Sequence, residues 1–243
     1  MDSTNKPARI AGLLYLFFTV TGLFNLIYVP GKLFVRGDAA ATASNILAHQ
    51  SLWRINIAIG VVSNLGFVFL ALALYHLLKD VSKWQARIML VLVLVQVPQA
   101  FLDEVNQLAA LVLARGADFL SVFDKPQRDA LAMLFLKLND QGTILSQAFW
   151  GIWLFPLGLL VFRSGFLPRF LGVWLIANGV AYLANSFAGL LLPQYLGIVS
   201  KITMPILLGE VAFMLWLVIM GAKPGLASGT GPTPAGGPSR GDV

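Results

Sequence analysis

The chain carries one acid inside a segment that is otherwise apolar. Glu210 lies eight residues after Ile202 and ten before Met220, in a run long enough to cross a membrane as a helix. A carboxylate near the centre of a bilayer costs about 3 kcal/mol on insertion scales, so its presence indicates a partner, a ligand or a cavity. Two interpretations stay open: Glu210 coordinates a ligand in a polar cavity, or it hydrogen-bonds to neighbouring helices and stabilises their packing.

A second polar group follows one face of an earlier apolar segment. At about 100° per residue in an α-helix, five polar side chains fall within about 100° of arc. They are Gln96, Gln99, Asp103, Asn106 and Gln107. Hydrocarbon does not solvate such a stripe, so we expect it to face the bundle interior, a water-filled cleft or another subunit, with its outer end able to reach the membrane surface. Glu104 falls outside the arc, and we expect it to be solvated at the outer boundary.

Two residues of the preceding apolar segment complete the candidate binding set. Asn64 can hydrogen-bond across helices. Arg54 opens this segment, where it either pairs with Asp103 or extends to lipid phosphates. The candidate ligand-binding residues are therefore Glu210, Asp103, Gln96, Gln99, Asn64 and Arg54.

Several kinds of chemistry have no residues to support them. The chain contains no cysteine, which excludes disulfides and thiolate chemistry. His49 and His76 lie at opposite ends of one helical region and cannot share a metal there. The sequence also contains no HExxH motif, nucleophile elbow or phosphate-binding glycine loop. We therefore expect no metal or cofactor, assign no catalytic residues, and exclude metal hydrolases and nucleotidases.

Six apolar stretches, nearly free of charge, predict the architecture. Only 12 % of the 243 residues are charged and 58 % are hydrophobic, whereas a soluble domain averages about a quarter charged residues. Each stretch can cross a hydrocarbon core of ~30 Å as a helix. The stretches run over 10–29, 55–78, 88–113, 142–162, 170–192 and 202–220. The prediction is an all-α, polytopic integral membrane protein with a bundle of six transmembrane helices.

The two longer connections are expected to form short outer interfacial helices. Asp38 precedes an alanine-rich run and is a favourable N-cap. Asp124 and Pro126 supply a cap and an N1 proline before the apolar run 130–136, which either lies at the interface or extends the fourth span outward. The chain then divides into a leader at 1–9, a membrane domain at 10–223 and a disordered tail at 224–243, rich in Pro, Gly, Ser and Thr.

Basic residues at the span ends predict the orientation. An even number of spans places both termini on one side, where the short connections and ends are rich in positive charge. They carry Lys6, Arg9, Lys79, Lys83, Arg87, Arg163, Arg169 and Lys223. By the positive-inside rule this side is cytoplasmic. These positions face lipid head groups or the inner aqueous phase, so the net charge of +6 does not indicate nucleic-acid binding.

The fifth span carries a stripe of small residues that favours close helix packing. The stripe consists of Ala177, Ala181, Ala184 and Ala188. Asn178 and Asn185 lie beside it and can hydrogen-bond to other helices, for example to Glu210. We interpret the stripe as packing rather than chemistry.

Four segments, taken in order, resemble a known bacterial family of membrane proteins. They are RIAGLLYL at 9–16, GDAAATASNI at 37–46, FWGIWLFPLG at 149–158 and RSGFLPRFLG at 163–172. The family is described as domain of unknown function 4386, and the resemblance covers about residues 8 to 223. It implies a six-span protein of the bacterial inner membrane. It implies no activity, so no functional residue is transferred from it.

Three hypotheses for the function remain. In the first, the helices surround a polar cavity for a small solute, ion or lipid, centred on Glu210 with the third-span stripe contributing, as in transport or sensing. In the second, the protein is a non-catalytic accessory or scaffold whose buried polar groups serve helix association. In the third and least favoured, it is a lipid-modifying enzyme that uses Asp103 and Glu210 as acid and base. Membrane lipids are expected partners in all three.

Overall fold

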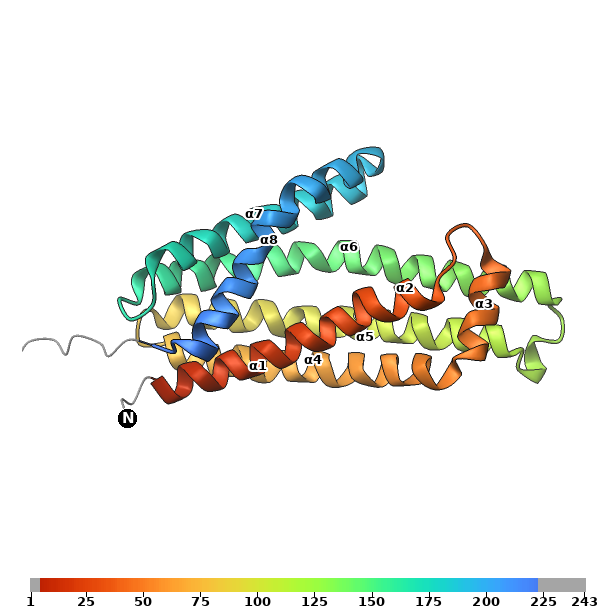
Figure 1. Ribbon diagram of the computed structural model, residues 1–243, viewed down its shortest axis with the longest axis horizontal. Coiled ribbons are helices and arrows are strands. Elements are labelled where there is room, and N and C mark those ends of the chain that lie inside the picture. Colours follow the sequence, from red (N-terminus) through yellow and green to blue (C-terminus); the bar gives the residue numbers. More distant parts are fainter. Residues whose placement is uncertain (1–4, 223–243) are drawn as a thin grey trace, which may run out of the picture.

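The computed structural model describes residues 5–222, which form helices joined by short connections (Figure 1). The expectations for the tail and for the first four residues lie outside the described residues. The first span consists of α1 (Asn5–Leu23), a π-helical turn η1 (Phe24–Tyr28) and α2 (Val29–Leu33). The elements that follow are α3 (Ala39–Ala48), α4 (Gln50–Leu78), α5 (Lys83–Arg115), η2 (Asp118–Leu120), α6 (Lys125–Arg163), α7 (Arg169–Leu191), η3 (Pro193–Tyr195) and α8 (Leu196–Ile219).

Six of these helical segments are long and apolar enough to cross a membrane. They span 29, 29, 33, 39, 23 and 27 residues in chain order, and the shortest still exceeds the ~20 residues that a hydrocarbon core requires. No strand occurs within residues 5–222. The prediction of an all-α, polytopic membrane protein with six transmembrane helices is therefore confirmed.

The six long helices form a closed ring. Each packs against the next one along the chain, and α8 returns to pack against α1. We call the end at which α1 begins and α8 finishes the terminal end, and the opposite end the α3 end. Towards the α3 end the α7–α8 hairpin tilts away from the other helices (Figure 1), so the ring is tight at the terminal end and wider at the other.

The two outer connections differ from each other. Asp38 caps α3 as predicted, since its side chain accepts a hydrogen bond of 2.8 Å from the Ala41 amide, and α3 packs on α5 and α6. The second segment is not a separate helix. Asp124 and Gln127 form a capping box at the start of α6, and no glycine or proline interrupts the chain between Pro126 and Gly142. The helix therefore runs on, and the apolar run extends the fourth span.

Apolar packing is concentrated in two clusters, one at each end of the bundle. The cluster at the terminal end includes Leu70, Leu74, Met89, Leu157 and Leu217. The cluster at the α3 end includes Val29, Ile46, Trp53, Leu111 and Leu136. Between them lies a layer in which α4 and α5 present polar side chains to the interior.

Helices α6 and α7 approach each other through glycines. A Cβ atom on Gly172 of α7 would lie 2.6 Å from the Gly158 carbonyl oxygen of α6, and one on Gly151 would lie 2.6 Å from the Gly179 carbonyl oxygen. Of the predicted alanine stripe, Ala181 and Ala188 are buried, whereas Ala184 is exposed. Glycine is needed at these positions because backbone atoms of the partner helix occupy the space of a side chain.

Two asparagines of α7 hydrogen-bond to α8, as expected, but their partners are not Glu210. Asn178 donates to the carbonyl oxygen of Leu207 at 3.3 Å. Asn185 donates to the Thr203 hydroxyl at 2.8 Å. Both asparagines are buried, so these bonds stabilise the hairpin in a medium that offers no competing water.

Candidate binding cavity

A cavity of about 120 Å³ lies in the polar layer between α1–η1, α4, α5 and α6. We call it the central cavity. Its polar lining consists of Asn25, Ser63, Asn64, Gln96, Asp103, Glu104, Gln107, Asn139, Thr143 and Ser146. None of the described residues that line it is basic.

Two adjacent carboxyls of α5 reach the cavity on different sides of that helix. Glu104 places its carboxyl directly against Gly60 of α4, and Asp103 places its carboxyl against Gly142 of α6. Neighbouring residues on a helix diverge by about 100°, and α5 lies between α4 and α6. Each carboxyl therefore occupies a space that exists only because the facing helix carries a glycine there.

A chain of amide side chains ends on the Glu104 carboxyl. Asn56 donates to Gln107 Oε1 at 2.8 Å, and Gln107 Nε2 donates to Glu104 Oε2 at 3.3 Å. In the amide orientation that satisfies both of its polar atoms, Asn25 donates to Asn56 Oδ1 at 2.9 Å. Asn25 belongs to the π-helical turn, a distortion that is frequent at functional sites. The chain links η1, α4 and α5 around the cavity.

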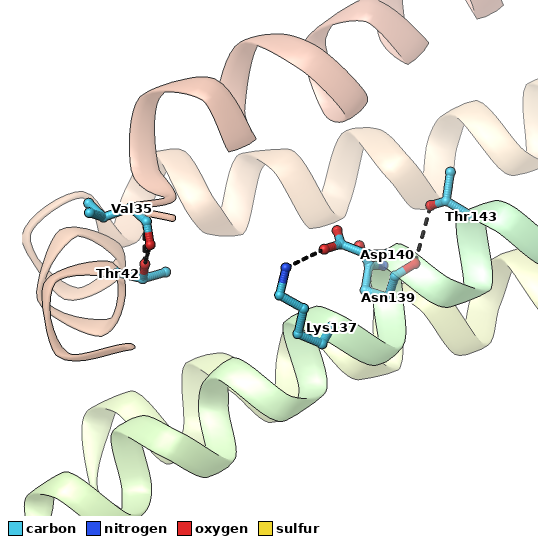
Figure 2. Close-up of polar contacts among 6 residues, drawn as sticks. All are labelled: Val35, Thr42, Lys137, Asn139, Asp140 and Thr143. Carbon is cyan, nitrogen blue, oxygen red and sulfur yellow. Dashed lines mark hydrogen bonds and ion pairs between the residues drawn. The ribbon is translucent and has the colours of Figure 1, made fainter. Parts of the chain in front are cut away.

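The Asp103 carboxylate accepts only a long hydrogen bond from its described neighbours. The Gln99 amide donates to its carboxylate at 3.4 Å, and the Asn139 amide of α6 donates to its backbone carbonyl at 3.0 Å. The backbone carbonyl of Asn139 accepts a hydrogen bond of 3.2 Å from the Thr143 hydroxyl one turn later in α6 (Figure 2). On the exposed side of α6, Lys137 pairs with Asp140 at 3.3 Å (Figure 2). Asp103 takes part in neither of the ion pairs found within residues 5–222.

Gln96 leaves an acceptor free at the cavity wall. Its side chain is 5 % exposed, and its Oε1 atom has no hydrogen-bond partner among the described residues. Buried amide oxygens are nearly always satisfied by protein, water or a ligand. The free acceptor is therefore available to a donor or a cation inside the cavity.

The structure brings together part of the predicted binding set. Asp103, Gln96 and Asn64 all line the central cavity, and Gln99 adjoins it through its bond to Asp103. Arg54 is exposed, and the ion pairs found within residues 5–222 do not include one between Arg54 and Asp103. The neighbouring Trp53 is buried in the bundle, so Arg54, about 100° further round the helix, faces outward.

Glu210 lies in a neighbouring pocket rather than in the central cavity. That pocket has a volume of about 210 Å³ and lies between α1 and α8, with α4, α6 and α7 behind them. The Tyr15 hydroxyl donates a hydrogen bond to Glu210 Oε1, and Tyr182 lines the same pocket. The two spaces share walls made by Phe18 and Trp150, among others. Instead of one cavity centred on Glu210, the structure has two adjoining pockets: one contains Glu210, and the other contains Asp103 and Glu104.

Sequence reasoning missed three residues of the central cavity or its support. Glu104, expected to be solvated, is only 7 % exposed. Asn25 and Asn56 were not singled out. A signal for α4 was available: Asn56, Gly60, Ser63 and Phe67 follow at spacings of 4, 3 and 4, which places them on one face of a helix.

The comparisons with known proteins agree with the resemblance seen in the sequence. The family model described as "Domain of unknown function (DUF4386)" matches residues 10–221. The chain is 37 % identical over 89 residues to an Archaeoglobus fulgidus protein named "Uncharacterized protein", and the match covers 37 % of this chain and 49 % of that relative. The match thus spans about half the length of this curated relative. No solved structure matches the chain. Since the family model covers residues 10–221, the chain belongs to the family described as Domain of unknown function (DUF4386).

Proposed function

We propose that this membrane protein binds a small monovalent cation, inorganic or of the ammonium type, in the central cavity, as the recognition step of transport or sensing. One observation carries the proposal: Asp103 and Glu104 line the same cavity, and none of the described residues lining it is basic. A carboxyl removed from water either binds a proton or, where it stays ionised, needs a counter-charge. A bound cation supplies that counter-charge.

The other lining groups suit the same kind of ligand. Gln96 Oε1 is buried without a partner, and amide and hydroxyl oxygens surround the acids. Oxygen atoms are the ligands that hard cations prefer, and they also accept hydrogen bonds from ammonium groups. Within residues 5–222 no group of three or more His, Cys, Asp or Glu could hold a metal ion, which favours a singly charged ligand over a divalent one.

The depth of the cavity bears on the side from which a ligand enters. An apolar cluster fills each end of the bundle, the larger one at the terminal end, and Glu104 lies 11 residues before the end of α5 at Arg115 and 21 after its start at Lys83. The cavity therefore belongs to the α3 half of the bundle. With both termini cytoplasmic in a bacterial inner membrane, as the basic residues and the family resemblance favour, the ligand would enter from the outside.

The test is a binding measurement on the full chain in lipid nanodiscs. Isothermal titration with methylammonium, Na⁺ and K⁺ should detect binding of at least one of them. The double variant Asp103→Asn/Glu104→Gln keeps the side-chain shapes and should weaken that binding by about tenfold or more, because it removes both groups that can carry a negative charge. Asp118→Asn, at an exposed acid of η2, is the matched control and should leave binding unchanged.

Two results would contradict the proposal. If the wild-type protein binds none of the three cations, and the double variant changes only thermal stability, the buried acids serve helix packing, as in a scaffold. If the purified protein instead converts lipids, which extraction and mass spectrometry would reveal, the enzymatic alternative is correct.

A further inference from the structure

The pocket around Glu210 opens sideways between α1 and α8. Near the terminal end the two helices touch, since a Cβ on Gly12 would lie 2.7 Å from the Val218 amide nitrogen. Towards the α3 end α8 diverges from α1 (Figure 1). The side chains lining the pocket there include Leu23, Leu26 and Ile27, which are 54 %, 52 % and 64 % exposed on the surface that faces hydrocarbon. A molecule dissolved in the bilayer can therefore reach the pocket.

Aromatic rings form most of the inner wall of this pocket. They are Tyr15, Phe18, Phe67, Trp150, Trp153 and Tyr182. The rings of Trp150 and Tyr182 meet edge to face with centroids 5.7 Å apart, and those of Tyr15 and Trp153 are tilted with centroids 6.5 Å apart. We call this space the aromatic pocket.

Glu210 is the one charged side chain among the residues that line the aromatic pocket. Its carboxyl accepts a hydrogen bond from Tyr15, which orients the group but brings no opposite charge. The other polar groups of the lining are the Thr19 and Tyr182 hydroxyls and the indole N–H groups of Trp150 and Trp153. The pocket thus combines one acid with several aromatic rings and contains few oxygen atoms that could replace the water shell of an inorganic ion.

We propose that the aromatic pocket is a second binding site, for an organic ammonium ion with apolar substituents that enters from the bilayer between α1 and α8. The face of an aromatic ring attracts a cation, and enclosure by several rings is the usual way to bind a quaternary ammonium group. The Glu210 carboxyl supplies the counter-charge. The apolar substituents fill the part of the pocket lined by Leu23, Leu207 and Val211.

Other occupants match the lining less well. An anionic head group would face Glu210 and find no base among the lining residues. A neutral acyl chain would fit the apolar walls but would not require an acid in the span, whose retention in hydrocarbon is costly. The inference does not depend on cation binding at Asp103 and Glu104, because those two residues do not line the aromatic pocket.

The test uses benzyltrimethylammonium as the probe, with the full chain in nanodiscs and empty nanodiscs as the blank. Titration calorimetry should detect saturable binding. Neopentylbenzene, in which carbon replaces the charged nitrogen, is the neutral competitor and should not displace the probe. Glu210→Gln should weaken binding by about tenfold or more. The double variant Asp103→Asn/Glu104→Gln should bind the probe as the wild type does.

A pair of variants at Tyr182 keeps the test decisive if Glu210→Gln fails to fold. Tyr182 lines only the aromatic pocket of the two pockets. Tyr182→Phe retains the ring and should bind the probe nearly as well as the wild type, whereas Tyr182→Leu should bind it several-fold more weakly. Absence of probe binding, equal binding by the Phe and Leu variants, or displacement by neopentylbenzene would overturn the proposal. Displacement would identify the space as an apolar lipid site.

Discussion

The contact between α6 and α7 gives the sharpest stability prediction, through the substitution Gly172→Ala. Gly172 is buried where the two helices are closest. The added Cβ would lie 2.6 Å from the Gly158 carbonyl oxygen, 2.6 Å from the Phe162 amide nitrogen and 2.9 Å from the Phe162 Cα. All three are backbone atoms, so no flexible side chain can move aside. The helices themselves must separate.

The magnitude follows from the overlap. The closest contacts fall short of the ordinary van der Waals limit of 3.4 Å by about 0.8 Å, and overpacking of a tight interior typically costs about 1–3 kcal/mol. Alanine also gains up to about 1 kcal/mol over glycine in helix propensity. A control variant should therefore gain helix propensity without a steric overlap. Gly197→Ala is such a control, because nothing lies within 4 Å of its Cβ position.

The measurement is thermal unfolding of both variants and the wild type in the same detergent, followed by far-UV circular dichroism. The difference in the free energy of unfolding between the two variants measures the cost of the overlap, about 1–3 kcal/mol. For a chain of this size, each kcal/mol lowers the unfolding midpoint by roughly 2–4 °C. Gly197→Ala should match or slightly exceed the wild type. Equal midpoints for the two variants would refute the reasoning, because α6 and α7 could not then approach through backbone atoms at Gly172.

Three further predictions use the caps and the acids. Gly60→Ala places a methyl group where the Glu104 carboxyl lies, so cation binding in nanodiscs should weaken by about tenfold or more. The control variant Asp118→Asn should bind the cation as the wild type does. Asp38→Ala removes the N-cap of α3 and should lower its local stability by about 1 kcal/mol; unchanged hydrogen exchange over α3 would contradict this. Asp124→Ala breaks the capping box of α6 and should speed exchange in its first turn only, with the half of α6 after Gly142 as the internal reference.

The spans were predictable because hydrophobicity decides which segments enter a membrane, but hydropathy does not locate the helix ends. By hydropathy the fourth apolar stretch was predicted to begin at residue 142, whereas α6 begins at Lys125, directly after the cap residue Asp124 that the sequence had indicated. Hydropathy falls at Asn139 and Asp140, yet both are compatible with a helix once it is formed. The start is decided by the cap at Asp124, which acts through backbone hydrogen bonds and not through polarity.

The closure of the ring could not be predicted from the sequence. The hydrogen bond between Tyr15 and Glu210 joins residues 195 positions apart, and no local pattern connects the first apolar run to the last. Pairing of distant helices in a membrane depends on packing of small residues. Gly12 provides this by contacting the backbone of α8 at Leu217 and Val218, a feature that a lone glycine in an apolar run does not reveal.

The position of Glu104 shows why helix periodicity finds only part of a buried site. The stripe from Gln96 to Gln107 was assigned to one face, on the assumption that a membrane helix has one inner side. α5 instead packs against α4 and α6, and each of those helices carries a glycine opposite an acid: Gly60 of α4 faces Glu104, and Gly142 of α6 faces Asp103. Whether an acid in a span is buried or solvated is thus decided by the neighbouring helix. A glycine on the partner helix, at a depth that matches an acid, is the sequence signal that would have placed both carboxyls in the same cavity.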